Sequence, residues 1–509
     1  MMKFRIFPFA VYAALFSCAF PAASQAAGAE AKTPSAASRT RFLSPAAISV
    51  RALPNGVRGV VQENPGADLV SVQVWVRAGS RFETKDNNGV THLIETLSLR
   101  GARSTPATKP GVENNIEAQK AIEALGGTLG SMTARDSMFY SATVASPFLP
   151  QALRVLSAAT LYPDLSDAKV EEAKEELLAE FILQSDPMVS ASDLAYSTAF
   201  STHPYQRPAH GTPAGVAALT GNKVRLYHKA RFAGANISVV VSGDVAPETG
   251  HKLIAQHFGG APKAQATPHI ADEKPQTGVL RQSRRGTLPV SVLTFAFRSP
   301  GIAKMDDVIA ADVLLAHWEE GRQAALGKVL RSVPLNSEEN EETEKSEDGE
   351  SGQQPAPKAE DEESAPLALG FEVDYLTQRD SGLFLITVVA PRDRAAVTSA
   401  ILGEITRVQN EGITDAELER AKNLLRHQYI QQGETHSGQA GSMGFYEMID
   451  SYQFAVTYLD RVARVTNDDV KRVATTYLKT DAHVQATVEG VRPPVEEPEK
   501  GTITAHVFH

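Results

Sequence analysis

The chain has a single cysteine, Cys18, among its 509 residues. Cys18 lies near the N-terminus, where Lys3 and Arg5 precede an apolar stretch that ends in small residues suited to cleavage. This pattern predicts a secretory signal peptide at residues 1–26, so the mature chain would have neither disulfides nor thiolate metal sites. A lipoprotein anchored at Cys18 is not expected, because Phe16 fits a lipobox poorly. The expected location is periplasmic or secreted.

Long apolar runs and basic charge are also scarce. No later segment reaches the roughly 18 apolar residues of a membrane helix, so no membrane span is predicted. Residues 337–363 hold twelve acidic residues and two lysines, which accounts for the whole net charge of −10. The remainder is near neutral, and nucleic-acid binding, which needs concentrated Lys and Arg, is not expected. Residues 337–365 are interpreted as a disordered acidic insertion rather than a specific docking element.

The rest of the chain uses one pattern twice. Apolar residues alternate at 69–76 and again at 290–297, as in strands, and a helical pattern follows each. The Ser-Asp-Ala helix start at 166–168 is paralleled by Thr-Asp-Ala at 414–416, and the halves close on strands at 237–244 and 484–490. Residues 133–144 are predicted as one further strand. The order predicts an α+β fold of two tandem homologous domains, each a mostly antiparallel sheet with helices packed on one face.

Changes in composition mark the expected boundaries. After the signal peptide they are a flexible leader at 27–47, an N-terminal domain at 48–260, a Pro-, Lys- and Gln-rich linker at 261–287, a C-terminal domain at 288–491 that carries the acidic insertion, and a tail at 492–509.

His92 and Glu95 have the spacing of a metallopeptidase zinc helix, H-x-x-E-H. In that pattern two histidines on one helical face hold zinc, while the glutamate faces the metal-bound water as general base. Here Thr96 replaces the second histidine. A threonine hydroxyl is neutral, donates weakly and is shorter than an imidazole. The pattern therefore predicts a damaged metal site with Glu95 as a vestigial catalytic residue.

Several further motifs follow in a shared order, at residues 53–56, 89–95, 124–127, 133–140, 203–205, 242–244 and 379–384. Together they resemble the pitrilysin or insulinase family of zinc metallopeptidases, especially short two-domain members similar to mitochondrial processing peptidase. The resemblance covers nearly the whole mature chain. It implies Glu180, ahead of an Asp-Pro pair, as the third metal ligand. It also places Ala173 where the family often has a second acidic residue.

The resemblance implies a substrate-binding role for Arg331 as well. In family assemblies the last domain of one half contributes an arginine and a tyrosine that hold the substrate backbone. Arg331 is the matching arginine. The segment Leu367-Ala368-Leu369, which follows the acidic insertion, has leucine where the tyrosine is expected.

A catalytic zinc ion needs three protein ligands and an open position for water, and His92 with Glu180 supplies two. His203 and His210 lie in an expected loop, and the resemblance gives them no metal-binding role. The preferred hypothesis is an exported noncatalytic subunit that binds no zinc alone. It would pair with a catalytic homologous subunit, or with itself as a homodimer, and enclose extended peptides. The alternatives are an active zinc-dependent endopeptidase with an unusual ligand set, and a nonenzymatic peptide-binding or assembly scaffold.

Overall fold

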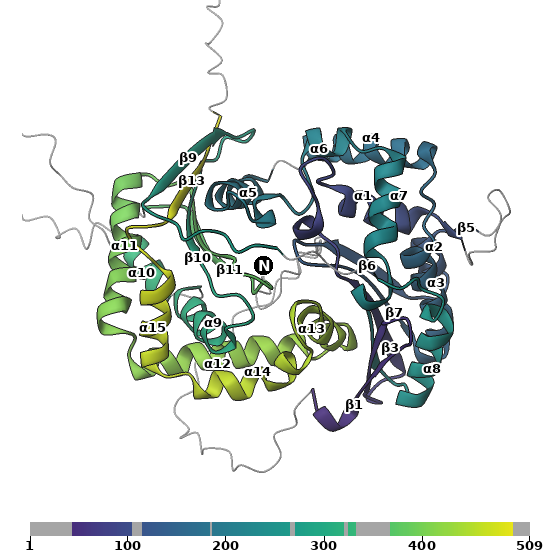
Figure 1. The fold of residues 1–509 in the computed structure, drawn as a ribbon. Coiled ribbons are helices and arrows are strands. Elements are labelled where there is room, and N and C mark those ends of the chain that lie inside the picture. The colour runs from purple at the N-terminus through teal and green to yellow at the C-terminus, as the bar shows by residue number, and fades with distance from the viewer. Residues whose placement is uncertain are drawn as a thin grey trace, which may run out of the picture.

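The computed structural model describes residues 43–103, 115–183, 186–264, 270–319, 324–331 and 367–491. Two β-sheets with their helices form two halves that lie side by side (Figure 1). The predicted α+β fold of two tandem domains is therefore confirmed. The signal peptide at 1–26, most of the leader at 27–47, the acidic insertion at 337–365 and the tail at 492–509 lie outside the described residues.

The first half contains a six-stranded sheet in the order β1-β2-β8-β3-β7-β6, antiparallel except where β2 pairs with β8. Its strands are β1 (Ile48–Ala52), β2 (Arg58–Glu63), β3 (Leu69–Val76), β6 (Thr128–Thr133), β7 (Met138–Ala145) and β8 (Ile237–Gly243), with β4 (Ala102–Arg103) and β5 (Asn115–Ile116) as a separate pair. Its helices are α1 (Val90–Arg100), α2 (Ala118–Glu123), α3 (Leu149–Leu161), α4 (Asp167–Leu183), α5 (Pro187–Ala199), α6 (Pro213–Ala217), α7 (Gly221–Arg231) and α8 (Pro247–Phe258).

The second half contains a five-stranded sheet in the order β11-β12-β10-β13-β9, in which only β13 and β9 are parallel. Its strands are β9 (Leu280–Arg285), β10 (Val292–Arg298), β11 (Gly370–Tyr375), β12 (Leu383–Val389) and β13 (Val484–Glu489). Its helices are α9 (Met305–Glu319), α10 (Ala325–Arg331), α11 (Arg394–Glu411), α12 (Asp415–Gln432), α13 (His436–Ile449), α14 (Gln453–Arg464) and α15 (Asn467–Tyr477). Over the described segments, every helix is too short or too polar to cross a bilayer.

Strand β3 shows why the sheets are buried on both faces. Val70, Val72 and Val74 belong to the core that the first half builds with its own helices. Trp75 points the other way and joins the core of the second half. Beside it, the Gln73 side-chain amide donates a hydrogen bond to the carbonyl oxygen of Ser437 in α13 (2.9 Å). The alternating sequence predicted a half-buried strand, but a helix from the other half covers the second face.

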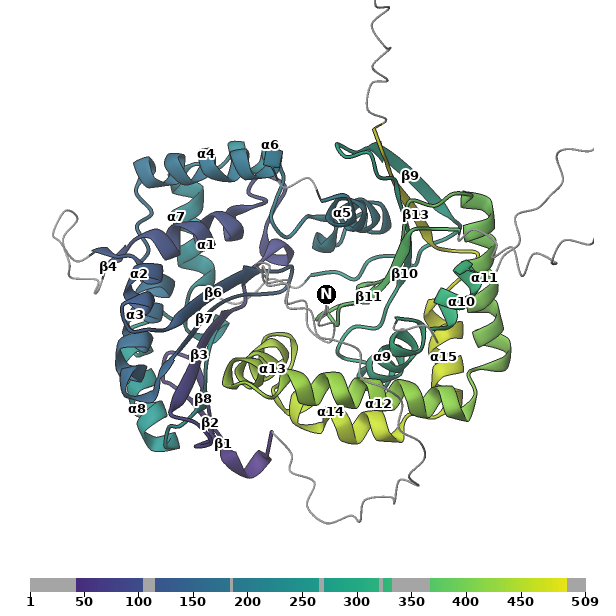
Figure 2. The same ribbon diagram turned by 180° about the vertical axis from the view of Figure 1, so that it is seen from behind.

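This exchange of helices is reciprocal. Helix α13, from the second half of the sequence, packs on β3 and β8 of the first sheet. Helix α5, from the first half, packs on β10 and β13 of the second sheet, where Tyr196 and Ala199 meet Ala296 and Val484. Both views of the ribbon show α5 beside the second sheet and α13 beside the first (Figures 1 and 2). Each domain therefore completes its core with a helix from the other.

Two details differ from the sequence-based expectations. Residues 133–144 form not one strand but the end of β6, a turn at 134–137 and most of β7. In the turn, the Asp136 carboxylate accepts a hydrogen bond from the Tyr205 hydroxyl (2.8 Å). The segment expected as a linker contains β9, which pairs with β13 as an edge strand.

Candidate functional site

The start of α1 is fixed by two glycines. Gly89 (φ +98°) and Gly211 (φ +85°) both have left-handed backbones, and they lie against each other. A Cβ built on Gly211 would come within 2.4 Å of the Gly89 Cα atom. Only glycine at both positions lets the backbones approach so closely. The loop that carries His210 is thereby held against the first turn of α1.

His92 and His210 meet at this contact. Their rings lie edge to face, with centroids 4.8 Å apart and planes inclined by 64°. The His92 Nδ1 atom is 3.4 Å from the His210 carbonyl oxygen. One turn further along α1, the Glu95 carboxylate accepts a hydrogen bond from the hydroxyl of Thr133, the last residue of β6. The structure thus brings His92, Glu95 and His210 together beside β6.

The protonation of these groups follows from their surroundings. Burial lowers the pKa of His92 and of His210, and it raises the pKa of Glu95. The negative charge of Glu180 opposes the effect on His92 and adds to the effect on Glu95. His92 and Glu95 are half-buried and His210 is exposed, so the surrounding atoms desolvate these groups without closing them off from water. Both imidazoles are therefore neutral at pH 7.

Thr96 has a different role. Its Oγ1 donates a hydrogen bond to the carbonyl oxygen of His92, 3.3 Å away on the preceding turn. This back-bonding is common for threonine within helices. The hydroxyl is thus engaged by its own helix.

Glu180 lies on α4, which packs against α1. The residue is half-buried, and its negative charge acts on both His92 and Glu95, which places it at the same site. Ala173 lies two turns earlier and is fully buried in the core of the first half. Of the two α4 positions that the resemblance marks, only Glu180 therefore brings a carboxylate to His92 and Glu95.

The fit to a zinc ion fails on donor count. Across the segments that the structure describes, no group of three or more His, Cys, Asp or Glu side chains is arranged to hold a metal ion. His92 and Glu180 are two donors, and the Thr96 hydroxyl is bonded to its own helix. The ligands expected from the sequence are therefore one donor short of a catalytic zinc site.

Arg331 is the last residue of α10, and its side chain lies outside the described part of the chain. The chain returns at Leu367, whose N–H donates a hydrogen bond to the Leu330 carbonyl oxygen (3.0 Å). Residues 330 and 367 thus adjoin, as the flanks of an insertion should. In the segment where tyrosine was expected, Leu367 is 1% exposed and Leu369 is 75% exposed, and neither side chain has a polar group to offer a substrate.

A second cluster of functional side chains was not predicted from the sequence. Three of the motif segments meet between the halves: Arg81 Nε donates to Asp380 Oδ2 (2.8 Å), and His203 Nε2 lies 3.1 Å from the same oxygen. Asp136 accepts hydrogen bonds from the Tyr205 hydroxyl (2.8 Å) and from the backbone N–H of Arg379 (3.1 Å). Buried charges need partners, and these residues supply them across the interface. The only sequence signal was that the motifs contain charged residues without an assigned role.

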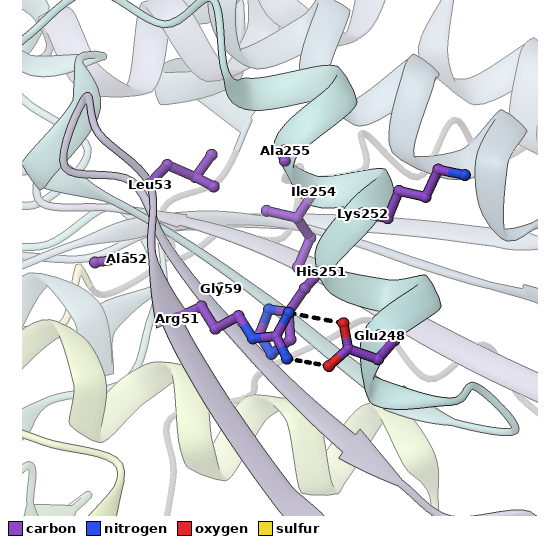
Figure 3. Close-up of a pocket in the computed structure, with 9 residues that line it drawn as sticks. All are labelled: Arg51, Ala52, Leu53, Gly59, Glu248, His251, Lys252, Ile254 and Ala255. Atoms are coloured by element: carbon purple, nitrogen blue, oxygen red, sulfur yellow. Dashed lines mark hydrogen bonds and ion pairs between the residues drawn. The ribbon is translucent and has the colours of Figure 1, made fainter.

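A cavity of about 270 Å³ lies away from these residues, between β1, β2 and α8 (Figure 3). Arg51 and Glu248 line it and pair with each other, with Arg51 Nη1 2.9 Å from Glu248 Oε2. The His251 ring is 3.0 Å from the Ser49 hydroxyl. Arg51 and Glu248 thus satisfy each other, and the cavity contains none of the residues expected for catalysis.

The comparisons with known proteins identify the class. Residues 58–213 match the model of the insulinase family, peptidase family M16, and residues 218–425 match that of the peptidase M16 inactive domain. The chain belongs to the insulinase family, M16.

Its relatives include a probable mitochondrial-processing peptidase subunit beta of Arabidopsis thaliana, 25% identical over 87% of this chain and 79% of that protein. An uncharacterized zinc protease of Streptomyces coelicolor is 26% identical over 83% of this chain and 85% of that protein. The crystal structure of a protease from Helicobacter pylori shares the fold, with a TM-score of 0.74, 20% identity, and coverage of 87% of this chain and 99% of that one.

Proposed function

We propose that this protein is an exported, noncatalytic subunit of a heteromeric peptidase. It works beside a homologous subunit that keeps a full H-x-x-E-H helix. The observation that carries the proposal is Thr96, whose hydroxyl bonds the carbonyl of His92 at the position where a zinc ligand is needed. Membership of the insulinase family and the subunit named among the relatives support it.

The contribution of this chain would be to bind extended peptides. Strand β6 is an edge strand of the first sheet, so one side of its backbone has no partner strand among the described residues. Extended peptides can add to such an edge as a further strand. Strand β6 ends at Thr133, whose hydroxyl donates a hydrogen bond to Glu95. A peptide bound along β6 would therefore pass beside His92 and Glu95.

Co-purification tests the subunit role. After gentle extraction of the tagged mature chain, a homologous chain with an intact H-x-x-E-H helix should co-elute and carry peptide hydrolysis. Glu95→Gln in this chain should leave that activity within about twofold, whereas the same change in the partner's helix should abolish it. Recovery of this chain alone would overturn the proposal, and a metal-free chain without a catalytic partner would support the scaffold alternative.

The metal content of the isolated chain tests directly whether the site at His92 and Thr96 binds zinc. The isolated wild-type chain should hold far less than one zinc per chain, because two ligands do not retain the ion. Thr96→His adds an imidazole as the third donor beside His92 and Glu180, so zinc content should rise toward one per chain. Thr476→His, on the exposed side of α15, serves as the matched control and should change nothing. Stoichiometric zinc in the wild-type chain would contradict the proposal.

One observation favours the endopeptidase alternative. Two imidazoles that share a tetrahedral zinc ion have ring centres about 5 Å apart, given Zn–N bonds of 2.0–2.1 Å. His92 and His210 are 4.8 Å apart. If His210 serves as the missing ligand, the wild-type chain will hold zinc and His210→Ala will lose it. Zinc content that is equally low in both proteins excludes this alternative.

Export is part of the proposal and has its own test. N-terminal sequencing of the protein isolated from the periplasm or medium should begin close after Ala26. A chain that keeps Met1 in the cytoplasmic fraction would contradict it.

A further inference from the structure

The two halves place an arginine at the same point of their sheets. Arg77 directly follows β3, and Arg298 ends β10; β3 and β10 are corresponding strands of the repeated pattern. Both strands lie inside their sheets, and each is covered by the helix that the other half contributes.

Arg77 bonds the end of α13. Its Nε donates to the carbonyl oxygen of Met448 (3.1 Å) and its Nη2 to that of Glu447 (3.0 Å). The last carbonyls of a helix have no partner within the helix and carry its negative end, so a guanidinium is well suited to bind them. Arg58 of β2 adds an ion pair with the Glu447 carboxylate, at 2.5 Å. The Arg58 Nε has no well-directed hydrogen bond, so this contact is chiefly electrostatic.

Arg298 does the same for α5. Its Nη2 donates to the carbonyl oxygen of Ala199, the last residue of that helix, at 2.6 Å. The guanidinium also lies over the Phe200 ring, 3.9 Å from its centroid. The two arginines are thus related by the internal repeat, and each binds the C-terminus of the helix inserted from the other half.

Separation of the halves would break these bonds and more. Arg81 and Asp136 are 8% exposed, and Arg81 bonds Asp380 across the interface. Opening would leave Arg81 without that partner and would uncover the Trp75 side of the first sheet. Breaking the ion pair between Arg81 and Asp380 and exposing apolar surface would both cost free energy, so both oppose opening.

We propose that Arg77 and Arg298 form a reciprocal clamp that joins the two halves into one cooperative unit, which neither opens in the native state nor unfolds in parts. Peptides and a partner subunit must therefore use the existing surface. The inference rests on the fold and holds whether or not the subunit proposal is correct.

The chain offers a direct measurement, because its two tryptophans lie at different places: Trp75 is in strand β3 of the first sheet, on the face that α13 covers, and Trp318 is in α9 of the second half. Trp318→Phe leaves Trp75 as the reporter, and Trp75→Phe leaves Trp318. Urea unfolding followed by fluorescence should give one shared midpoint for the two single-tryptophan proteins. In the Arg77→Met/Arg298→Met background the two midpoints should separate by roughly 0.5 M urea or more.

Methionine keeps the apolar stem of arginine and removes the donors. Arg284→Met, on the fully exposed strand β9, is the matched control and should leave the midpoints together. Coincident midpoints in the double variant, or separate midpoints in the wild-type background, would overturn the clamp. If the double variant does not fold, each single variant carries the test, and Arg77→Lys should restore part of the shared transition.

Discussion

At the scale of single residues, Glu83 governs the start of α1. It is 3% exposed and accepts hydrogen bonds from the backbone N–H groups of Gly89 (2.8 Å) and Thr91 (2.9 Å) and from the Asn88 side chain (2.8 Å). A carboxylate at a helix N-terminus satisfies donors that the helix leaves free. The position of His92 therefore depends on Glu83.

We predict that Glu83→Ala lowers the free energy of unfolding by about 3 kcal/mol, because it leaves several buried donors without an acceptor. Urea denaturation measures this. Glu434→Ala, at an exposed position, should cost no more than about 0.5 kcal/mol. Equal effects of the two substitutions would contradict the role given to Glu83.

Asp312 on α9 predicts a pH dependence. Burial raises the pKa of Asp312 from 3.8 to about 7, although the Tyr458 hydroxyl donates a hydrogen bond to it (2.9 Å). The folded protein holds this proton more tightly than the unfolded chain. The contribution to stability is therefore complete below about pH 4 and is lost as the pH rises through about 7.

Asp312→Asn should remove this dependence. Between about pH 4 and pH 8, the stability of the variant relative to wild type should rise by about 2 kcal/mol, below the full value because residue 312 is partly exposed. Urea unfolding at several pH values gives the difference. Asp86→Asn, at an exposed site, is the control. A difference that stays constant with pH would show that Asp312 does not titrate in this range.

At the scale of elements, α13 lies close to the first sheet because it carries glycine where it crosses Trp75. A Cβ on Gly444 would come within 2.0 Å of the Trp75 Nε1 atom, whereas a Cβ on Gly403 of α11 meets nothing within 4 Å. Gly444→Ala should therefore cost about 2 kcal/mol through overpacking, and Gly403→Ala should gain up to about 1 kcal/mol. Denaturant unfolding followed by fluorescence measures the free energy of unfolding of the two variants. A neutral Gly444→Ala would mean that α13 can shift away at no cost.

The sequence predicted the helices and strands better than it predicted which of them pack together. Local periodicity gave β3 with its observed bounds and placed a helix after it, because these patterns depend on residues close in the chain. Periodicity does not say which sheet a helix covers, so the exchange of α5 and α13 was not foreseen. Within the site, spacing identified His92 and Glu95. The approach of His210 depends on the contact of Gly89 with Gly211, over one hundred residues apart, and no local pattern shows it.

At the scale of the whole molecule, Glu273 ties the connection between the halves to the end of α5. Its carboxylate accepts hydrogen bonds from the backbone N–H groups of Ser201 (3.0 Å), Thr202 (2.8 Å) and His203 (2.7 Å). Burial alone would raise the pKa of Glu273, but the hydrogen bonds outweigh it and lower the pKa to about 2. The stabilisation is therefore present above about pH 4.5 and is lost as the pH falls through about 2.

Glu273→Gln should accordingly lower the free energy of unfolding by about 1 kcal/mol near neutral pH, a modest figure because the group is partly exposed. The difference from wild type should shrink as the pH approaches 2. Asp272→Asn alters the neighbouring exposed carboxylate and should show neither effect. Thermal unfolding of the wild-type protein and of both variants across this pH range measures the two effects.

The exchange of α5 and α13 has a practical consequence for anyone who dissects this polypeptide. A fragment that stops near residue 264 would carry α5 with no sheet to cover and would leave its own sheet bare beside Trp75. Such a fragment made alone should aggregate. A protease nick between residues 264 and 270, by contrast, should leave two pieces that migrate together on a sizing column until a denaturant releases them.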